Sequence, residues 1–423
     1  MSQLHQCRSC GSTDLTPILD LGMQPIANAL VEPERIGGPE PRFPLEVAFC
    51  GACALVQVTE TIPPAELFGR DYPYYSSVSP FLLAHSRDHA LRLIGDRRLG
   101  PDSLVVEVAS NDGYLLRNFV AAGIPVLGID PAAGPAAAAR EIGVPTVGDF
   151  FGADLARRLA AEGKQADVIL ANNVLAHVEG INGFVEGFAV LLKDDGIAEF
   201  EFPYLLDLVE SCAFDTIYHE HVFYYSLTAL EPLFGRHGLY LNEVERLDIH
   251  GGSLRLTVSR RPGASPRLAA LMAEERRLGM DRLPFYADFA GRVARVREDL
   301  RALVGELRSQ GARIAAYGAA AKGATLLNYA GLDHTALAYV VDRNPHKVGR
   351  HMPGLGLPIR PVEALENDRP DYLLILAWNF GREIMAQQRA FAEAGGRFIL
   401  PVPTPTVTDG TAPAAVKIGA LAG

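Results

Sequence analysis

The chain has 423 residues, which is too long for one ordinary domain and predicts two or three. Apolar residues make up 48% of it and charged residues 21%, the proportions of a soluble globular enzyme. The net charge of −11 argues against nucleic acid or an anionic membrane as the main partner. No signal peptide and no apolar run of membrane-spanning length is recognisable, so we expect a cytoplasmic protein.

Four of the five cysteines form two C-x-x-C pairs, Cys7 with Cys10 and Cys50 with Cys53. In a reducing compartment such pairs are metal sites more often than disulfides. Four thiolates close a tetrahedral zinc site and leave no position for water. The spacing therefore predicts a structural zinc ion in an N-terminal module, residues 1–70. A redox dithiol and disulfides are the alternatives.

A helix is predicted over residues 80–98, and the pattern after it repeats strand, turn and helix. Buried strands are expected at 104–108, 125–129, 146–147, 167–171 and 197–202. Two later strands, 239–247 and 253–259, predict an antiparallel pair at the end of the sheet. This α/β order is that of the class I methyltransferase fold, a Rossmann-like doubly wound sheet, here over residues 71–260.

A second, Rossmann-like α/β unit is predicted over residues 313–423, after charged connecting helices in 261–312. Its strands are expected at 314–317, 337–341, 372–377 and 397–400. The loop that follows the first of them lacks the G-x-G-x-x-G pattern of dinucleotide sites. Lys322 in that loop lies near the start of a helix, which suits a phosphate. The alternative is a Rossmann-like unit that binds nothing.

The ends of the first four strands carry candidate cofactor residues. Gly113 lets the backbone approach a ligand where a helix begins. Asp130 is placed to bind ribose hydroxyls, and Asp149 to accept from an adenine amino group while Phe150 packs on the ring. No phosphate loop of the Walker type accompanies them, which favours an adenosine cofactor without phosphate. Ordinary strand-end aspartates are the alternative. The candidates are Glu107, Ser110, Asn111, Asp112, Gly113, Asp130, Asp149, Phe150 and Asn172.

Two further groups of polar residues are expected at the same cleft. Asn173 and His177 follow the fourth strand, where Asn173 could hydrogen-bond the cofactor or the substrate. The run Tyr218-His219-Glu220-His221 follows the fifth strand and combines two imidazoles, a carboxyl and a phenol. Such groups take, give or hold a proton near neutral pH. A solvated turn with incidental histidines is the alternative.

In these motifs the sequence resembles the sugar C-methyltransferases that act on nucleotide-linked 4-keto-deoxysugars in antibiotic pathways. The resemblance covers essentially the whole chain and is carried by the cysteine pairs and by residues 21–28, 107–114, 218–221 and 317–322. It implies a zinc-binding module, a core that binds S-adenosylmethionine, and a C-terminal Rossmann-like domain, with the substrate in the cleft between them. Zinc would then be structural only.

The resemblance also implies a mechanism. A base removes the proton from the carbon beside the 4-ketone, and the resulting enolate takes the methyl group. His221 matches the base, and Glu220 matches a residue that orients or polarises it. Tyr218 and His177 match groups near the ketone oxygen or the reacting carbon, where donors stabilise the enolate. C3 is the expected position, with C5 as the alternative, and thymidine diphosphate is the expected nucleotide.

One of Tyr72 and Tyr75 should match a further active-site tyrosine. We favour Tyr72 as the catalytic residue and Tyr75 as a substrate contact. The alternatives to a sugar C-methyltransferase are a methyltransferase on a non-sugar natural-product scaffold, an NAD-dependent oxidoreductase, and a zinc-stapled binding protein. The missing glycine pattern argues against the oxidoreductase. A free scaffold would leave Lys322 without a phosphate, and a mere binding protein needs no base.

Overall fold

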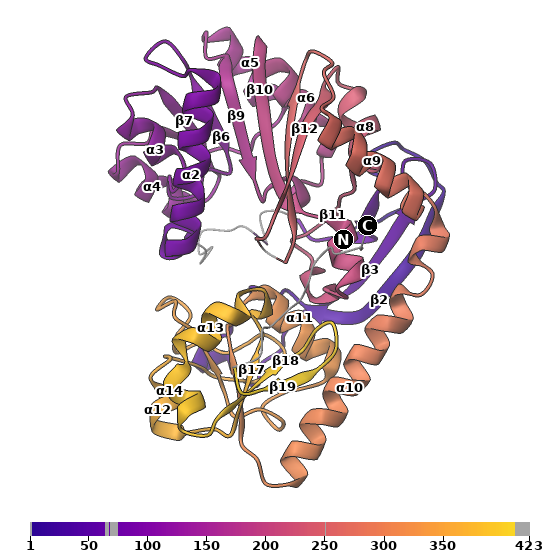
Figure 1. The fold of residues 1–423 in the computed structure, drawn as a ribbon, viewed down its shortest axis with the longest axis vertical. Coiled ribbons are helices and arrows are strands. Elements are labelled where there is room, and N and C mark those ends of the chain that lie inside the picture. The colour runs from indigo at the N-terminus through magenta and orange to yellow at the C-terminus, as the bar shows by residue number, and fades with distance from the viewer. Residues whose placement is uncertain (1, 64–66, 68–74, 250, 411–423) are drawn as a thin grey trace.

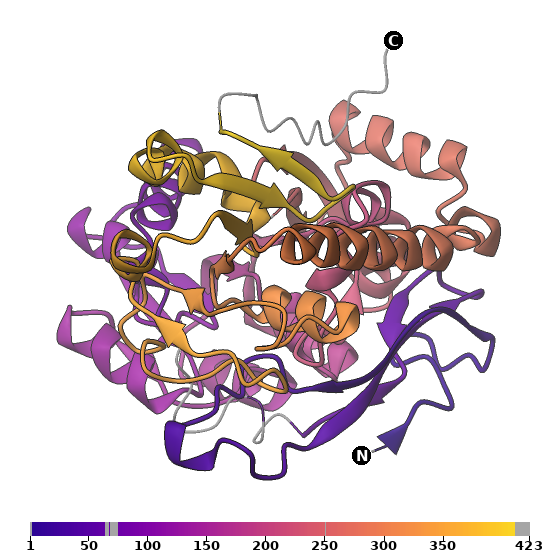
Figure 2. The same cartoon turned by 90° about the horizontal axis from the view of Figure 1, so that it is seen from below.

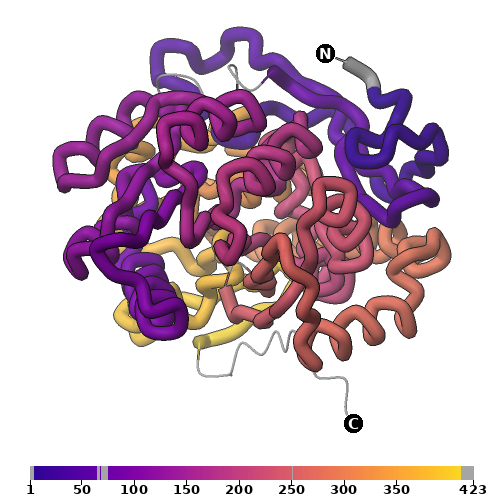
Figure 3. Tube along the Cα trace, turned by 90° about the horizontal axis from the view of Figure 1, so that it is seen from above, coloured from indigo at the N-terminus to yellow at the C-terminus, as the bar shows by residue number. Residues whose placement is uncertain are grey.

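The computed structural model describes residues 2–63, 67, 75–249 and 251–410. An N-terminal β-sheet lies beside two stacked α/β units, and the long helix α10, Phe289–Ser309, runs along the lower unit (Figure 1). Seen from below, α10 crosses the face of the C-terminal unit (Figure 2). Seen from above, the N-terminal strands follow one edge of the molecule (Figure 3). Within the described ranges, no helix is long and apolar enough to cross a membrane.

The central sheet has seven strands in the order β12-β13-β10-β9-β6-β7-β8. They are β6 Val105–Val108, β7 Val126–Ile129, β8 Thr146–Val147, β9 Ala166–Asn172, β10 Leu192–Pro203, β12 Tyr240–Leu247 and β13 Ser253–Ser259. Strands β6 to β10 run parallel, and β13 runs antiparallel between β10 and β12. The order confirms the predicted class I methyltransferase fold.

Both faces of this sheet are buried, as the unbroken apolar runs of its strands predict. Two neighbouring residues of β6 illustrate this burial. Val105 packs into a hydrophobic core cluster on one face of the sheet, and Val106 packs into a second cluster on the opposite face. The covering helices are α2 Pro80–Arg97, α3 Leu116–Ala121, α4 Ala133–Glu141, α5 Ala153–Ala161 and α6 Ile181–Leu191. Helix α2 begins where Ser79 accepts a hydrogen bond from the amide of Leu82, with a proline at the first helical position.

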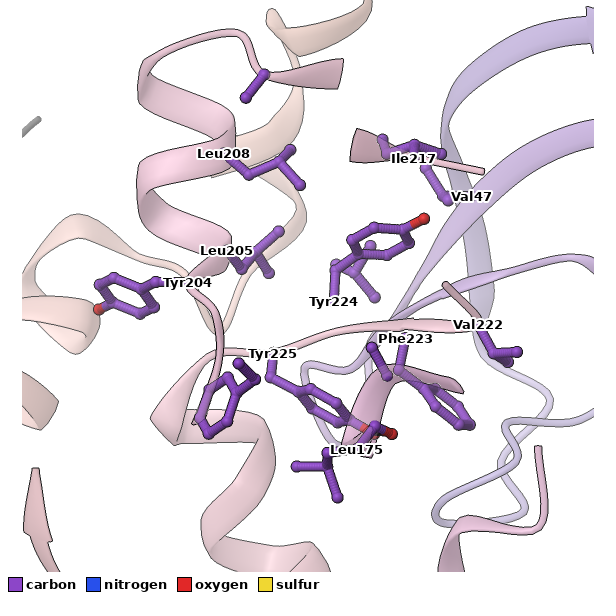
Figure 4. Close-up of a cluster of buried hydrophobic side chains, with 14 of the residues drawn as sticks. Val47, Leu175, Tyr204, Leu205, Leu208, Ile217, Val222, Phe223, Tyr224 and Tyr225 are labelled. Carbon is purple, nitrogen blue, oxygen red and sulfur yellow. Dashed lines mark hydrogen bonds between the residues drawn. The ribbon is translucent and has the colours of Figure 1, made fainter. Parts of the chain in front are cut away.

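The N-terminal sheet has the strand order β11-β4-β3-β2. Its strands are β2 Leu15–Pro25, β3 Arg42–Cys50, β4 Val56–Val58 and β11 Phe223–Tyr224. Strand β11 comes from the central unit, immediately after residues 218–221, and pairs antiparallel with β4. The sequence did not indicate this strand. Figure 4 shows the apolar seam that results, with Val47 of β3 lying near Ile217 and Tyr224.

The C-terminal unit contains a six-stranded sheet in the order β16-β15-β14-β17-β18-β19. The strands are β14 Ile314–Tyr317, β15 Val340–Val341, β16 Ile359–Arg360, β17 Tyr372–Ile375, β18 Arg397–Leu400 and β19 Thr406–Thr408. Its helices are α11 Ala321–Ala330, α12 Ala364–Asp368, α13 Gly381–Gln387 and α14 Arg389–Glu393. All strands but β19 run parallel, as expected for a Rossmann-like unit. Helices α9, Pro266–Leu278, and α10 connect the two units.

Candidate active site

A cavity of about 790 Å³ opens at the carboxyl ends of the central strands. Strands β6 and β9 adjoin there while their connections leave in opposite directions, and ligands bind at such a point in doubly wound folds. The cavity reaches from Asp130 at the end of β7 to Lys322 at the start of α11. His177 and His221 also line it. The central sheet, the C-terminal unit and the histidine cluster therefore border one cavity.

Five of the nine predicted cofactor residues line this cavity: Asn111, Asp130, Asp149, Phe150 and Asn172. The other four form the floor and turn of the loop behind them. Gly113 has φ +76°, and a Cβ there would lie 3.0 Å from Val144, so the turn requires glycine. Burial, together with the nearby negative charges of Asp130 and Asp112, raises the pKa of Glu107 well above its usual value.

Several buried polar atoms around this loop lack a hydrogen-bond partner among the described residues. They include Oγ of Ser110, Oδ1 of Asp112 and Oδ1 of Asn172. Unpaired buried acceptors are costly, and they fit a ligand that brings donors. Asp130 accepts from the amides of Asn111 and Ala132, both at 2.8 Å, which holds its carboxyl in a fixed orientation at the cavity. Asp130 and Asn172 both line the cavity, and their acceptor oxygens fit the hydroxyl and ammonium groups of S-adenosylmethionine.

Asp149 and Phe150 lie at the outer rim of the cavity. Oδ2 of Asp149 accepts from Arg158 at 3.1 Å, and its Oδ1 accepts from the amide of Phe150 at 2.9 Å. The Phe150 ring is 55% exposed, which leaves a face available to a planar ligand group. Both residues thus lie at the predicted strand end, and one carboxylate oxygen of Asp149 is hydrogen-bonded to Arg158.

The cluster formed by Tyr218, His177 and His221 is centred on His221. Its Nδ1 lies 2.9 Å from the backbone oxygen of Thr216, and a carbonyl can only accept, so Nδ1 carries the hydrogen. Nε2 is then the basic nitrogen, and the phenol of Tyr218 donates to it over 2.8 Å. The ring of His177 approaches the same imidazole edge-on, with centroids 4.8 Å apart. The structure therefore brings together three of the predicted catalytic residues.

His177 sits in a 3-10 turn, Leu175–His177, directly after β9. Its Nδ1 donates to the backbone oxygen of Glu220 over 2.6 Å. Burial lowers the pKa of His177 to about 4, so the ring is neutral at neutral pH. A neutral imidazole can donate one hydrogen bond and accept another, and here the carbonyl of Glu220 fixes which nitrogen donates.

Glu220 is placed differently from its expected position beside the base. Its side chain is 1% exposed, and Oε1 accepts from Nδ2 of Asn28 at 3.1 Å. Oε2 has no hydrogen-bond partner among the described residues. Burial raises the pKa of Glu220 to about 7, although the hydrogen bond from Asn28 opposes that shift. The carboxyl thus meets Asn28, while the backbone of Glu220 orients His177.

Asn28 is a cavity residue that was not singled out from the sequence. It lies in residues 21–28, which carry the family resemblance but were not expected to contribute to the cavity. His219 next to the cluster turns the other way: its Nε2 meets the backbone oxygen of Pro44 at 3.1 Å, and its ring packs edge-on against Phe43. Both contacts join the histidine cluster to the N-terminal sheet.

The C-terminal side of the cavity is basic. Nζ of Lys322 donates to Asn379 over 2.7 Å and lies 4.6 Å from the Trp378 ring centroid. Burial lowers the pKa of Lys322, and the nearby charge of Asp215 opposes this. Lys347 also lines the cavity, and no side chain caps the amino end of α11. Two ammonium groups beside an uncapped helix start are suited to an anion.

Two of the remaining predicted residues are described. Asn173 lines the cavity with φ +54°, and its amide donates to the backbone oxygen of Glu201 at 2.7 Å. Tyr75 stacks on His346 of the C-terminal unit, with ring centroids 5.7 Å apart. Tyr72 lies outside the described residues.

The four cysteines meet as predicted. Their sulfur atoms all lie within 4.8 Å of one another, with Cys7 to Cys53 at 3.7 Å and Cys10 to Cys50 at 3.6 Å. A tetrahedron with Zn–S bonds of about 2.3 Å has S···S edges of about 3.8 Å, so the spacing fits zinc. Gln57 donates to Sγ of Cys7 at 3.1 Å, which favours a thiolate there.

Three family models match successive parts of the chain. They are described as "Putative zinc binding domain", over residues 7–68, "Methyltransferase domain", over 83–244, and "C-methyltransferase C-terminal domain", over 248–403. The C-methyltransferase NovU of Streptomyces niveus is 37% identical over 412 residues, which cover 96% of this chain and 97% of that protein.

Solved methyltransferases resemble part of the chain. Magnesium protoporphyrin IX methyltransferase from Synechocystis, with bound S-adenosylmethionine, is 16% identical with a TM-score of 0.33, covering 42% of this chain and 79% of that one. The CcbJ methyltransferase from Streptomyces caelestis is 13% identical with a TM-score of 0.33, covering 43% and 90%. On the family models and the full-length relationship to NovU, this chain belongs to the S-adenosylmethionine-dependent C-methyltransferases that carry an N-terminal zinc-binding domain.

Proposed function

We propose that the enzyme methylates the carbon beside the 4-keto group of a nucleotide-linked 4-keto-deoxysugar. The methyl acceptor is C3, and the nucleotide is thymidine diphosphate. The observation that carries the proposal is one cavity lined both by His221 and by Lys322, Lys347 and the uncapped start of α11. A base and an anion site in the same space suit a substrate with an acidic carbon at one end and phosphates at the other.

The chemistry assigned to this chain is a proton transfer with stabilisation of the charge that it creates. Nε2 of His221 takes the proton from the carbon, and the electron pair of the C–H bond moves into the ketone oxygen as an enolate. For Nε2 to be free for this step, Tyr218 first turns its hydrogen bond from Nε2 to the ketone oxygen, where it then stabilises the enolate. Bound S-adenosylmethionine would supply an electrophilic methyl group: the new bond to the enolate carbon forms as the S–CH3 bond breaks, and S-adenosylhomocysteine is the leaving group.

In the proposal, three domains and one connecting segment divide this work. Residues 1–70 hold zinc, 71–260 hold the cofactor and the base, 261–312 connect, and 313–423 hold the phosphates. The positive charge of the cavity favours a nucleotide sugar over the alternative substrate, a non-sugar natural-product scaffold. Lys322 has the charge of Asp215 nearby, but a neutral scaffold would leave Lys347 and the uncapped start of α11 without an anion.

Deuterium exchange tests the base directly. The wild-type enzyme is incubated in D₂O with S-adenosylhomocysteine and a thymidine diphosphate 4-keto-6-deoxysugar. We expect the proton on C3 to exchange for deuterium, which proton NMR records as the loss of the C3 signal. His221→Asn should abolish the exchange and still bind S-adenosylmethionine in calorimetry. His237→Asn is the matched control, because His237 bonds to Asn182 and does not line the cavity. Unchanged exchange in His221→Asn would remove the base assignment.

A further inference from the structure

The segment that follows β2 passes from the zinc-binding module into the catalytic cavity. Strand β2 ends at Pro25, and Asn28, three residues later, lines the cavity. Two short turns shape this stretch, since the amide of Ala29 donates to Ile26 at 3.1 Å and that of Leu30 to Asn28 at 2.9 Å. A residue of the N-terminal module therefore stands next to the histidine cluster.

The segment is also fastened on its far side. Val31 and His351 exchange backbone hydrogen bonds of 2.9 and 2.8 Å, and Arg350 pairs with Glu32 at 2.8 Å. His351 belongs to the C-terminal unit, so the position of Asn28 is set from two directions. Such double anchoring limits the freedom of a side chain that lies between the fixed points.

Asn28 contacts one group in the cavity with a defined polarity. Its Nδ2 lies 3.1 Å from Oε1 of Glu220, and a carboxylate only accepts, so the amide must donate. Glu220 is 1% exposed and its Oε2 lacks a partner among the described residues, which makes this donor important to the charged form. The backbone amides of Glu220 and Asn28 also favour the charged carboxyl, and the Asn28 side chain adds the one side-chain donor that reaches it among the described residues.

Glu220 in turn connects to the chemistry through its backbone. Its carbonyl oxygen receives Nδ1 of His177 at 2.6 Å, and it directly precedes His221 in the chain. Fixing the Glu220 side chain therefore fixes the peptide that orients His177 and carries the base. A displacement of about 1 Å at a reacting group can cost about a hundredfold in rate.

We propose that Asn28 is a positioning residue of the active site, which brings from the zinc-binding module the hydrogen bond that holds Glu220 in the cavity. Its effect on turnover rests on the proposed function, whereas its effect on Glu220 does not. The zinc-binding module thus contributes to catalysis through a side chain.

Thermal unfolding against pH tests the contact without any substrate. The pKa of Glu220 is about 7, so the carboxylate that needs the donor is present at pH 8.5 and scarce at pH 5.5. Asn28→Ala should lower Tm more at pH 8.5 than at pH 5.5, and in a Glu220→Gln background this pH dependence should vanish. An equal loss at both pH values in both backgrounds would overturn the proposal.

An isosteric variant covers the case in which alanine merely loosens the fold. Asn28→Asp places a second carboxyl against Glu220, so it should lower Tm at pH 8.5 by like-charge repulsion and recover towards wild type at pH 5.5. Asn118→Asp is the matched control, because the Asn118 amide donates to the carbonyl oxygen of Leu115. The same pH response in both variants would overturn the proposal.

Kinetics complete the test. With a keto-sugar substrate, Asn28→Ala should lower kcat about tenfold to a hundredfold and leave the calorimetric affinity for S-adenosylmethionine unchanged. If the wild type turns over and Asn28→Ala has the same kcat, the positioning role of Asn28 is overturned and the proposed function stands. No turnover by the wild type, with the pH-dependent unfolding as expected, overturns the proposed function and supports the Asn28–Glu220 contact.

Discussion

The phenol oxygen of Tyr218 lies 2.8 Å from Nε2 of His221, on the opposite side of the ring from the nitrogen that donates to Thr216. Since Nδ1 donates to a carbonyl, Nε2 is the ring nitrogen that faces the phenol. This arrangement also places a phenol where it can exchange one acceptor for another when a ketone enters. In the proposed mechanism, this pair supplies both the base and a stabiliser of the charge that the base creates.

Removal of the phenol hydroxyl tests that second role. We expect Tyr218→Phe to lower kcat about 10²- to 10³-fold, because one donor to the developing oxyanion is lost. Affinity for S-adenosylmethionine, measured by calorimetry, should stay unchanged. The matched control is Tyr240→Phe, whose ring is 46% exposed on β12. A kcat for Tyr218→Phe within a factor of two of wild type would contradict the role.

His177 predicts a loss of stability on mild acidification. Burial lowers its folded-state pKa to about 4, below its unfolded value of about 6.5, so the unfolded chain binds the proton more readily. The contribution is present above pH 6.5 and is lost as the pH falls towards 4. His177→Gln should therefore narrow the difference in Tm between pH 7 and pH 4.5. An unchanged difference in Tm would contradict the lowered pKa of His177 in the folded state.

The cysteine cluster predicts one zinc ion per chain by elemental analysis. Cys53→Ala removes one of four ligands, so the zinc content should fall to near zero and Tm should drop. Methyl transfer should be lost as well, because β4 of this module pairs with β11 behind the histidine cluster. Cys212→Ala is the control and should keep its zinc, since this buried thiol lies outside the cluster. A zinc-loaded Cys53→Ala would exclude the tetrahedral site.

A buried ion pair in the central sheet predicts a pH-dependent stability. Burial alone would raise the pKa of Glu201, but a hydrogen bond from His85 and the charge of Arg255 bring it to about 2. Arg255 donates to Glu201 through Nε over 2.7 Å, and the glutamate is 2% exposed. Arg255→Leu should cost about 3–5 kcal/mol at pH 7 in urea unfolding, because it removes the permanent positive charge beside a buried carboxylate and leaves only histidine partners.

The same cost should shrink in acid. The pKa of Glu201 lies below its unfolded value of about 4.5, so the stabilisation is present above pH 4.5 and is lost as the pH falls towards 2. Arg276→Leu is the control, since Arg276 and Glu231 form an exposed pair worth less than about 1 kcal/mol. Equal costs for the two substitutions at pH 7 would contradict the account.

The sequence was a good guide wherever apolar runs were long. The core strands β6 and β7 begin within a residue of their predicted starts, because strands buried on both faces are unbroken apolar runs. The cysteine spacing likewise specifies its own cluster. Strand β10 begins five residues earlier than predicted, at Leu192. Its first part is polar and pairs irregularly with β9, so no apolar run marks it in the sequence.

The rest depends on pairings between distant parts of the chain. Asn28 and Glu220 are 192 residues apart, and nothing in either local sequence indicates the other. Strands β11 and β16 have two residues each, too few for a period-two pattern to be read. Tyr75 stacks on His346 of the other unit, a contact that the order of elements does not indicate.

The most direct test of the central claim is mass spectrometry of a single reaction. It contains the purified protein, S-adenosylmethionine and a thymidine diphosphate 4-keto-6-deoxysugar. We expect a nucleotide sugar heavier by one methylene group, formed together with S-adenosylhomocysteine. If the sugar keeps its mass while calorimetry shows that the cofactor is bound, the acceptor is not a sugar of this class and the proposed function is contradicted.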